Sequence, residues 1–113
     1  MKPKYRIEFL DEAVEFLNNL DEKAREKIYY NLKKSQIKND NSLVKKLNNE
    51  IWEFRTLYKQ TQYRLFAFWD KTDKIDTLVI STHGIEKKTQ KTPKKEIEKA
   101  KNLKKHYFNN LKK

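Results

Sequence analysis

Cysteine is absent from this sequence, and residues that bend the chain or bind metals are scarce: its 113 residues include no Cys, one Gly, two Pro and two His. Without Cys the chain has no disulfide framework, no thiolate nucleophile and no zinc–thiolate site. A single Gly excludes a glycine-rich phosphate-binding loop. Because no group of His or carboxylate residues has the spacing of metal ligands, we expect neither a metal nor another cofactor.

Long apolar runs are also absent. No segment approaches the length that spans a bilayer, and acidic residues interrupt the N-terminal stretch where a signal peptide has its apolar core, so we expect a cytoplasmic protein without a membrane partner. Aromatic residues, by contrast, are plentiful, with six Phe, six Tyr and two Trp. They supply the apolar surface that a folded core needs. The length then predicts one domain that spans residues 1–113.

The whole chain has a formal net charge of +11, and most of this positive charge is concentrated in its last quarter. Residues 1–86 contain 16 Lys and Arg against 14 Asp and Glu, a net of +2, whereas residues 87–113 contain 11 Lys against two Glu, a net of +9. Such a one-sided basic block is typical of proteins that bind a polyanion. A solvated lysine-rich helix has the same composition, so charge alone leaves both interpretations open.

Periodicity predicts a strand and two helices in the first third of the chain. Positions 4–9 alternate between apolar and polar residues, as in a half-buried strand. Asp11 and Asp21 are predicted N-caps of two helices that form a hairpin, the second of which extends to about Lys38. The apolar residues at helical spacing are Ala13, Val14, Leu17 and Leu20 in the first helix, and Ala24, Ile28 and Leu32 in the second.

Aromatic and β-branched residues dominate the next part of the chain. The runs 50–58, 62–69 and 74–82 are separated by short polar breaks, which predicts a three-stranded antiparallel meander. The third run is apolar on both faces, as in an interior strand, with Ile75 and Val79 on one face and Leu78 and Ile80 on the other.

An amphipathic helix is predicted after the third run, with Thr92 as its N-cap and Pro93 at its first position. The apolar stripe of this helix consists of Ile97, Ala100, Leu103, Tyr107 and Leu111, and lysines cover the rest of its circumference. The whole chain is thus predicted to be an α+β fold in the order β-α-α-β-β-β-α.

Two arginines within the predicted strands and one histidine after them are candidate functional residues. An Arg among aromatic residues is often paired with a carboxylate, and Glu53 is the expected partner of Arg55. A guanidinium group is also a permanent cation whose planar fork of donors suits phosphate, so Arg55 and Arg64 are equally a candidate anion clamp. His83 precedes the only Gly, Gly84, and a histidine at a strand end is more often structural than catalytic.

Three motifs occur in a specific order: "WEFR" at 52–55, "YR" at 63–64, and "HGIEKKTQKTP" at 83–93 followed by "EIEKA" at 96–100. In this combination, positions 47–107 resemble the phage-derived branch of the RelE/HigB-like toxins. The resemblance implies a RelE-like microbial RNase fold and the toxin of a type II toxin–antitoxin pair, a metal-independent endoribonuclease that cleaves mRNA in the ribosomal A site. It implies as partners mRNA, ribosomal RNA and a helix-turn-helix antitoxin, through which alone the toxin contacts operator DNA.

Cationic side chains carry the chemistry that the resemblance implies. In cleavage without a metal the 2′-OH attacks phosphorus, so the protein must orient it, move protons and stabilise negative charge. The resemblance assigns these tasks to Arg64, Arg55, Lys87 and Lys88, of which we expect Arg64 to stabilise the transition-state charge. His83 is a further catalytic candidate as a proton shuttle, and the general base and acid stay open. Glu86 departs from the pattern, which usually has a neutral residue there. The lysines expected to bind nucleic acid are Lys91, Lys94, Lys95, Lys101 and Lys105.

Two other classes of protein share parts of this pattern. A non-enzymatic RNA- or ribosome-binding module would have the basic helix but would need no paired arginines within the sheet. A DNA-binding regulator would need a recognition helix, and the strongly basic C-terminal helix is not preceded by the partner helix of a helix-turn-helix motif. A nuclease assay separates the binding module from the enzyme.

Overall fold

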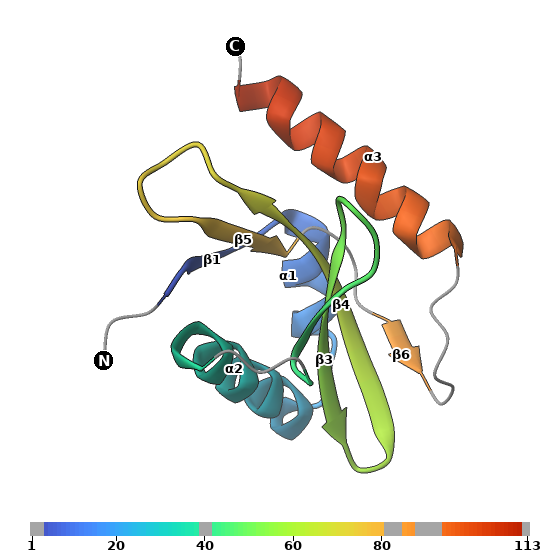
Figure 1. Cartoon of the computed structure of the whole chain (residues 1–113). Helices are drawn as coiled ribbons and strands as arrows, with labels where there is room; N and C mark the ends of the chain where they lie inside the picture. Colours follow the sequence, from blue (N-terminus) through green and yellow to red (C-terminus); the bar gives the residue numbers. More distant parts are fainter. Residues whose placement is uncertain (1–3, 39–41, 81–84, 88–93, 112–113) are drawn as a thin grey trace.

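The computed structural model of the chain describes residues 4–38, 42–80, 85–87 and 94–111 (Figure 1). The elements follow one another as β1 (Arg6–Phe9), α1 (Asp11–Asn18), α2 (Glu22–Ile37), β2 (Val44–Lys46), β3 (Trp52–Tyr58), β4 (Thr61–Asp70), β5 (Thr77–Ile80), β6 (Ile85–Lys87) and α3 (Lys94–Leu111). The α+β class and the predicted order are confirmed, with two added strands. The sequence did not predict β2 and β6, because three residues are too few to show alternation.

All six strands form one mixed sheet, whose order is β1-β5-β4-β3-β2, while β6 pairs with β4. Strands β3, β4 and β5 form the predicted antiparallel meander. The interior place of β5 is also confirmed, since β5 lies between β4 and the parallel strand β1. The predicted start of this strand was wrong: β5 begins at Thr77, and Ile75 lies before it and is 44% exposed. Residues 81–82 of the predicted strand lie outside the described residues.

The two N-terminal helices differ in how they begin. Asp21 is the N-cap of α2, as predicted, and its carboxylate accepts a hydrogen bond from the amide of Ala24. The prediction for Asp11 was wrong, because Leu10 is the N-cap of α1 and Asp11 is its first helical residue. There the carboxylate lies at the positive end of the helix dipole, so an acid remains favourable one position later. Thr92 and Pro93, the predicted start of the last helix, lie outside the described residues.

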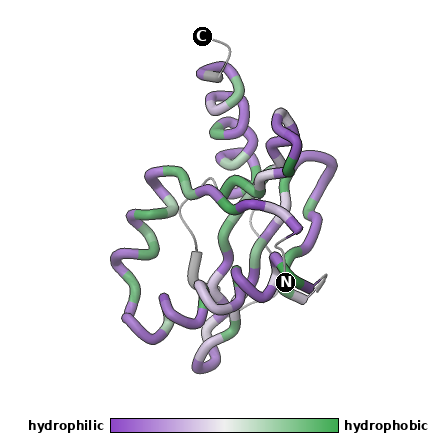
Figure 2. The backbone as a smooth tube through the Cα atoms, turned by 90° about the vertical axis from the view of Figure 1, so that its left-hand side faces the viewer, coloured by the Kyte–Doolittle hydropathy of each residue, from purple (hydrophilic) through white to green (hydrophobic). Residues whose placement is uncertain are grey.

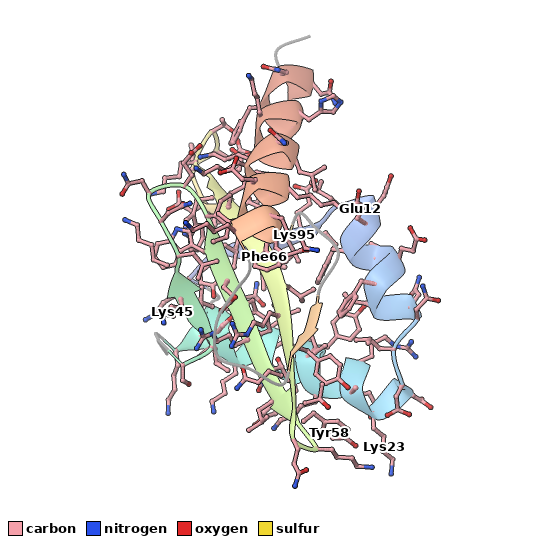
Figure 3. All side chains as sticks on the ribbon, turned by 90° about the vertical axis from the view of Figure 1, so that its right-hand side faces the viewer. Glu12, Lys23, Lys45, Tyr58, Phe66 and Lys95 are labelled. Atoms are coloured by element: carbon pink, nitrogen blue, oxygen red, sulfur yellow. The ribbon has the colours of Figure 1, made fainter. Side chains whose placement is uncertain are left out.

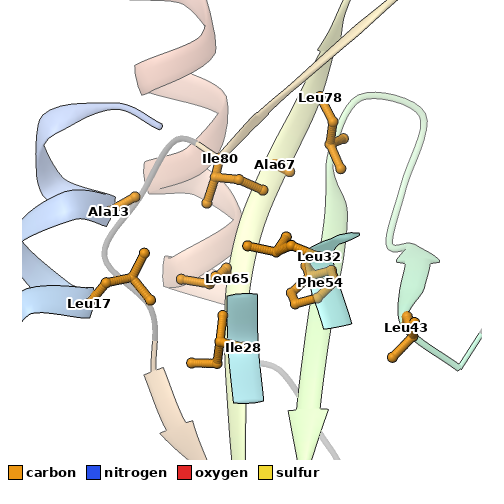
Figure 4. Close-up of a cluster of buried hydrophobic side chains, with 10 residues drawn as sticks. All are labelled: Ala13, Leu17, Ile28, Leu32, Leu43, Phe54, Leu65, Ala67, Leu78 and Ile80. Carbon is orange, nitrogen blue, oxygen red and sulfur yellow. The ribbon is translucent and has the colours of Figure 1, made fainter. Parts of the chain in front are cut away.

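Helices cover both faces of the sheet. On one face, α1 and α2 bury a cluster of apolar side chains, shown in Figure 4: Ala13, Leu17, Ile28, Leu32, Leu43, Phe54, Leu65, Ala67, Leu78 and Ile80. Of the apolar positions predicted for α1, Ala13 and Leu17 belong to this cluster, whereas Val14 is 42% exposed. The angle between neighbouring helical residues explains the difference, since Val14 lies about 100° around the helix from Ala13.

On the other face, α3 packs on a second cluster formed by Ile51, Phe66, Phe68, Val79 and Ala100. Figure 2 shows the amphipathic character of α3 as alternating purple and green along the helix near the C-terminus. Because side chains alternate along a strand, β4 and β5 supply both clusters. Within the described residues, no helix has the length and apolar composition needed to cross a membrane.

Candidate functional site

Arg55 and Arg64 lie directly opposite each other on the neighbouring strands β3 and β4. Their pairing follows from the turn between the strands, in which only Lys59 and Gln60 separate the paired residues Tyr58 and Thr61. Both turn residues have positive φ angles, 47° and 68°, which a two-residue hairpin turn of this hand requires. The predicted break at 59–61 was one residue too long, so the sequence did not reveal that the two arginines face each other.

A single carboxylate joins the two arginines. Glu53 Oε1 accepts a hydrogen bond from Arg55 Nε at 2.6 Å, and Glu53 Oε2 lies 3.5 Å from a terminal nitrogen of Arg64. The side chains of Glu53 and Arg64 are completely buried, whereas that of Arg55 is 22% exposed. The predicted pairing of Arg55 with Glu53 is confirmed, and Arg64 joins it to form one three-residue ionic cluster.

The geometry of this cluster gives the two arginines different capacities. Glu53 binds Arg55 through Nε, and this hydrogen bond fixes the plane of the guanidinium group of a partly exposed side chain. A carboxylate that carries one charge faces two cations, so the cluster keeps a net positive charge. Arg64 has no contact with solvent in this structure. Of the two arginines, only Arg55 is therefore exposed to solvent, and Arg64 contacts Glu53 from within the sheet.

The short strand β6 brings one more predicted residue to this part of the sheet. Lys87 pairs with Gln62, and Ile85 pairs with Arg64, so the backbone of Lys87 lies two positions along β4 from the arginine pair. Three other predicted residues, His83, Lys88 and Lys91, lie outside the described residues. Sequence separation conceals this proximity, because β6 is more than 20 residues from Arg64.

Helix α3 presents its lysines in two ways. Lys94, Lys95 and Lys105 are exposed. Lys101, by contrast, lies 3.6 Å from Glu98 and 4.0 Å from Glu50, and Lys104 lies 3.5 Å from Glu50. In Figure 3 the first turn of α3, marked by Lys95, lies beside Phe66. Since Phe66 is two residues from Arg64 along β4, the exposed lysines of this turn lie near the ionic cluster.

The far part of α3 is attached to the sheet by a partly buried polar contact. The Tyr107 hydroxyl donates a hydrogen bond to Asp70 at 2.6 Å, and the Thr72 hydroxyl donates one at 2.6 Å. Burial raises the pKa of Tyr107, and the hydrogen bond to Asp70 and the charge of Glu8 raise it further. Burial also acts to raise the pKa of Asp70, but the hydrogen bonds from Thr72 and Tyr107 outweigh it and lower this pKa.

A hollow of about 540 Å³ lies elsewhere, between the start of α1 and the later turns of α3. Acidic residues line it, among them Glu8, Asp11 and Glu12. These charges repel phosphate, so the ionic cluster on β3 and β4 is the better candidate for an anion site. Among the described residues, no group of three or more His, Asp or Glu has an arrangement that could hold a metal ion.

Comparison with models of protein families identifies the family of this chain. Residues 15–105 match the model of the family described as phage derived protein Gp49-like (DUF891), so the chain belongs to this family. The family is associated with the toxins of toxin–antitoxin pairs. A comparison with curated proteins finds no match.

Proposed function

We propose that this protein is the toxin of a type II toxin–antitoxin pair and acts as a metal-independent mRNA interferase on the ribosome. The observation that carries the proposal is the ionic cluster of Glu53, Arg55 and Arg64, in which Glu53 fixes the orientation of the partly exposed Arg55 side chain on the sheet. Membership of the Gp49-like family supports the toxin assignment, and the RelE-like order of elements agrees with it.

The proposed reaction is an in-line displacement within the RNA. The 2′-oxygen forms a bond to phosphorus as it gives up its proton, the bond between phosphorus and O5′ breaks, and O5′ takes up a proton. The products are a 2′,3′-cyclic phosphate and a 5′-hydroxyl. Charge increases on the phosphoryl oxygens as the bond forms, and a preorganised cation stabilises that charge without having to reorient.

Arg55 takes the role of that cation in our proposal, and Arg64 acts as a positioning residue. The exposure of Arg55 allows contact with a phosphate, whereas the buried Arg64 acts through Glu53. The proposal retains Lys87 and Lys88 as further cations and His83 as a candidate proton shuttle. The exposed lysines at the start of α3, Lys94 and Lys95, would bind flanking phosphates.

Single-turnover cleavage of ribosome-bound mRNA in excess EDTA tests the proposal. Arg55→Ala is expected to lower the cleavage rate roughly 100-fold, the scale of losing one charge-stabilising donor, and Arg55→Lys to recover part of it. Lys71→Ala, which removes an exposed loop cation, is the matched control and is expected to cleave at the parental rate. Parental cleavage by Arg55→Ala would overturn the placement of the site, and intact mRNA with the parent protein would overturn the enzyme.

A non-enzymatic ribosome-binding module is the second candidate, and the burial of Arg64 favours it, because a buried Arg–Glu pair also suits a purely structural role. The two candidates share the prediction for α3. Replacing Lys94, Lys95 and Lys105 by Gln is expected to weaken RNA binding and to lower the slope of log K against log salt concentration by up to about 2 for single-stranded RNA. Tight binding to ribosomes together with intact mRNA at full occupancy would select the binding module.

A further inference from the structure

Helix α2 carries an exposed stripe that the proposed catalytic site does not use. Its members recur at intervals of four and three residues, the spacing of a helix-packing seam, and all are exposed: Lys23, Lys27, Tyr30, Lys34 and Ile37. Tyr30 is 61% exposed and Ile37 is 36% exposed. The residues on the opposite side of α2 are buried against the sheet: Ala24, Ile28, Asn31, Leu32 and Ser35. The exposed stripe is therefore a second seam, which faces outward.

The seam contains a shallow hollow of about 380 Å³ in its C-terminal half. Its walls are the Tyr30 ring, the Ile37 side chain and the stems of three lysines: Lys33, Lys34 and Lys38. No acidic residue occurs between positions 30 and 38. The hollow thus has an apolar floor and a positively charged rim. In Figure 1, α2 lies at the margin of the molecule, with the sheet on one side of it.

We propose that this seam of α2 is a docking site for an acidic amphipathic helix of the antitoxin; the identity of the partner rests on the proposed function. The apolar anchors Tyr30 and Ile37 are seven residues apart, about two helical turns, and match side chains at the same spacing on a partner helix laid along the seam. The lysine rim requires acidic residues on the flanks of that helix, since complementary charge steers association and sets the register.

Charge and position argue against two other occupants. A second copy of this chain would bring the same lysines together, and each copy carries a formal net charge of +11. Single-stranded RNA prefers successive aromatic platforms, whereas this seam offers the single ring of Tyr30. Moreover, α2 packs on the face of the sheet opposite α3, whereas the ionic cluster shares the face of Phe66 and α3.

The test uses the purified product of the reading frame beside this gene and the full-length chain. Tyr30→Ser combined with Ile37→Ser is expected to weaken binding at least about tenfold, as for anchor residues at an interface. Lys33→Glu, Lys34→Glu and Lys38→Glu together are expected to weaken it similarly and to slow association. Because all five residues are exposed, melting temperatures should stay near the parental value.

Matched controls come from a loop distant in sequence. Ile75→Ser removes a similarly exposed apolar side chain, and Lys71→Glu with Lys74→Glu reverses similarly exposed charges. These variants should bind within about twofold of the parent, since isolated surface positions contribute little to binding. All the α2 variants should still arrest growth when expressed alone.

Several outcomes would overturn the proposal: no binding of the neighbouring product to the parent chain, or parental binding by both sets of α2 variants. If the α2 variants bind oligo(U) more weakly but bind the antitoxin as the parent does, the seam is an RNA site. If sedimentation shows that the parent chain is a dimer and that Tyr30→Ser is a monomer, the seam binds a second copy of the chain. If the α2 variants lose the antitoxin while the parent cleaves no mRNA, the docking site stands and the proposed enzyme fails.

Discussion

Replacing Glu53 by Gln should destabilise the protein more than any single surface change. The substitution conserves shape but removes the negative charge that lies 2.6 Å from Arg55 and 3.5 Å from Arg64. Arg64 is completely buried, so its charge would lose the compensation that this carboxylate provides in a medium of low dielectric constant. Loss of one partner from a buried ion pair costs about 3–5 kcal/mol of unfolding free energy.

The expected shift is large enough to measure without ambiguity. At about 4 °C or more per kcal/mol for a domain near this size, Glu53→Gln should lower Tm by at least about 12 °C. Urea denaturation followed by circular dichroism gives the free energy directly. Glu50→Gln is the matched control, because Glu50 pairs with Lys101 and Lys104 at the surface, where an ion pair contributes about 0–1 kcal/mol.

A double-mutant cycle then separates the charge effect from packing. Arg64→Met combined with Glu53→Gln also removes the buried cation that has lost this carboxylate, so the double variant is expected to be more stable than Glu53→Gln alone. The reasoning is refuted if Glu53→Gln unfolds within about 1 kcal/mol of the parent. It is equally refuted if the double variant is less stable than Glu53→Gln, because the buried charge would then not be the source of the loss.

Three further substitutions test other parts of the fold. Gln60→Gly should stabilise the protein by about 1 kcal/mol, since Gln60 has a φ of 68° that glycine adopts at lower cost; an unchanged urea midpoint would contradict this. Tyr107→Phe should cost about 1.5–3 kcal/mol at neutral pH by removing a hydrogen bond to a carboxylate. The raised pKa of Tyr107 means that the parent begins to lose this contribution as pH rises above about 10, so the stability difference between the parent and Tyr107→Phe should shrink from that pH upward. Asp70 has a lowered pKa, so its contribution is present above about pH 4 and is lost as pH falls through the folded-state value. Asp70→Asn should therefore lose less stability than the parent as pH falls below about 4. An identical loss of stability at acid pH in the two proteins would refute the role given to Asp70.

The sequence by itself determined much of the framework. Length and aromatic content predicted a folded domain, and periodicity predicted its α+β class. Aromatic and β-branched runs between polar breaks located the meander, whose strands β3 and β4 each extend over seven residues or more. Asp21 and the end of α2 near Lys38 were also predictable, since N-caps and helical periods are local properties of the chain. The pairing of Arg55 with Glu53 followed from their shared strand face, two residues apart.

Only the tertiary structure decided how these pieces meet. A break one residue shorter than predicted brought Arg55 opposite Arg64, because each residue in a hairpin turn shifts the register of every pair beyond it. The burial of Arg64, the joining of both arginines by Glu53 and the return of β6 beside β4 depend on elements that are far apart in sequence or on different strands. Local residue pattern carries no record of such distances, so the sequence indicated which residues carry charge, and the fold decided which of them an anion can reach.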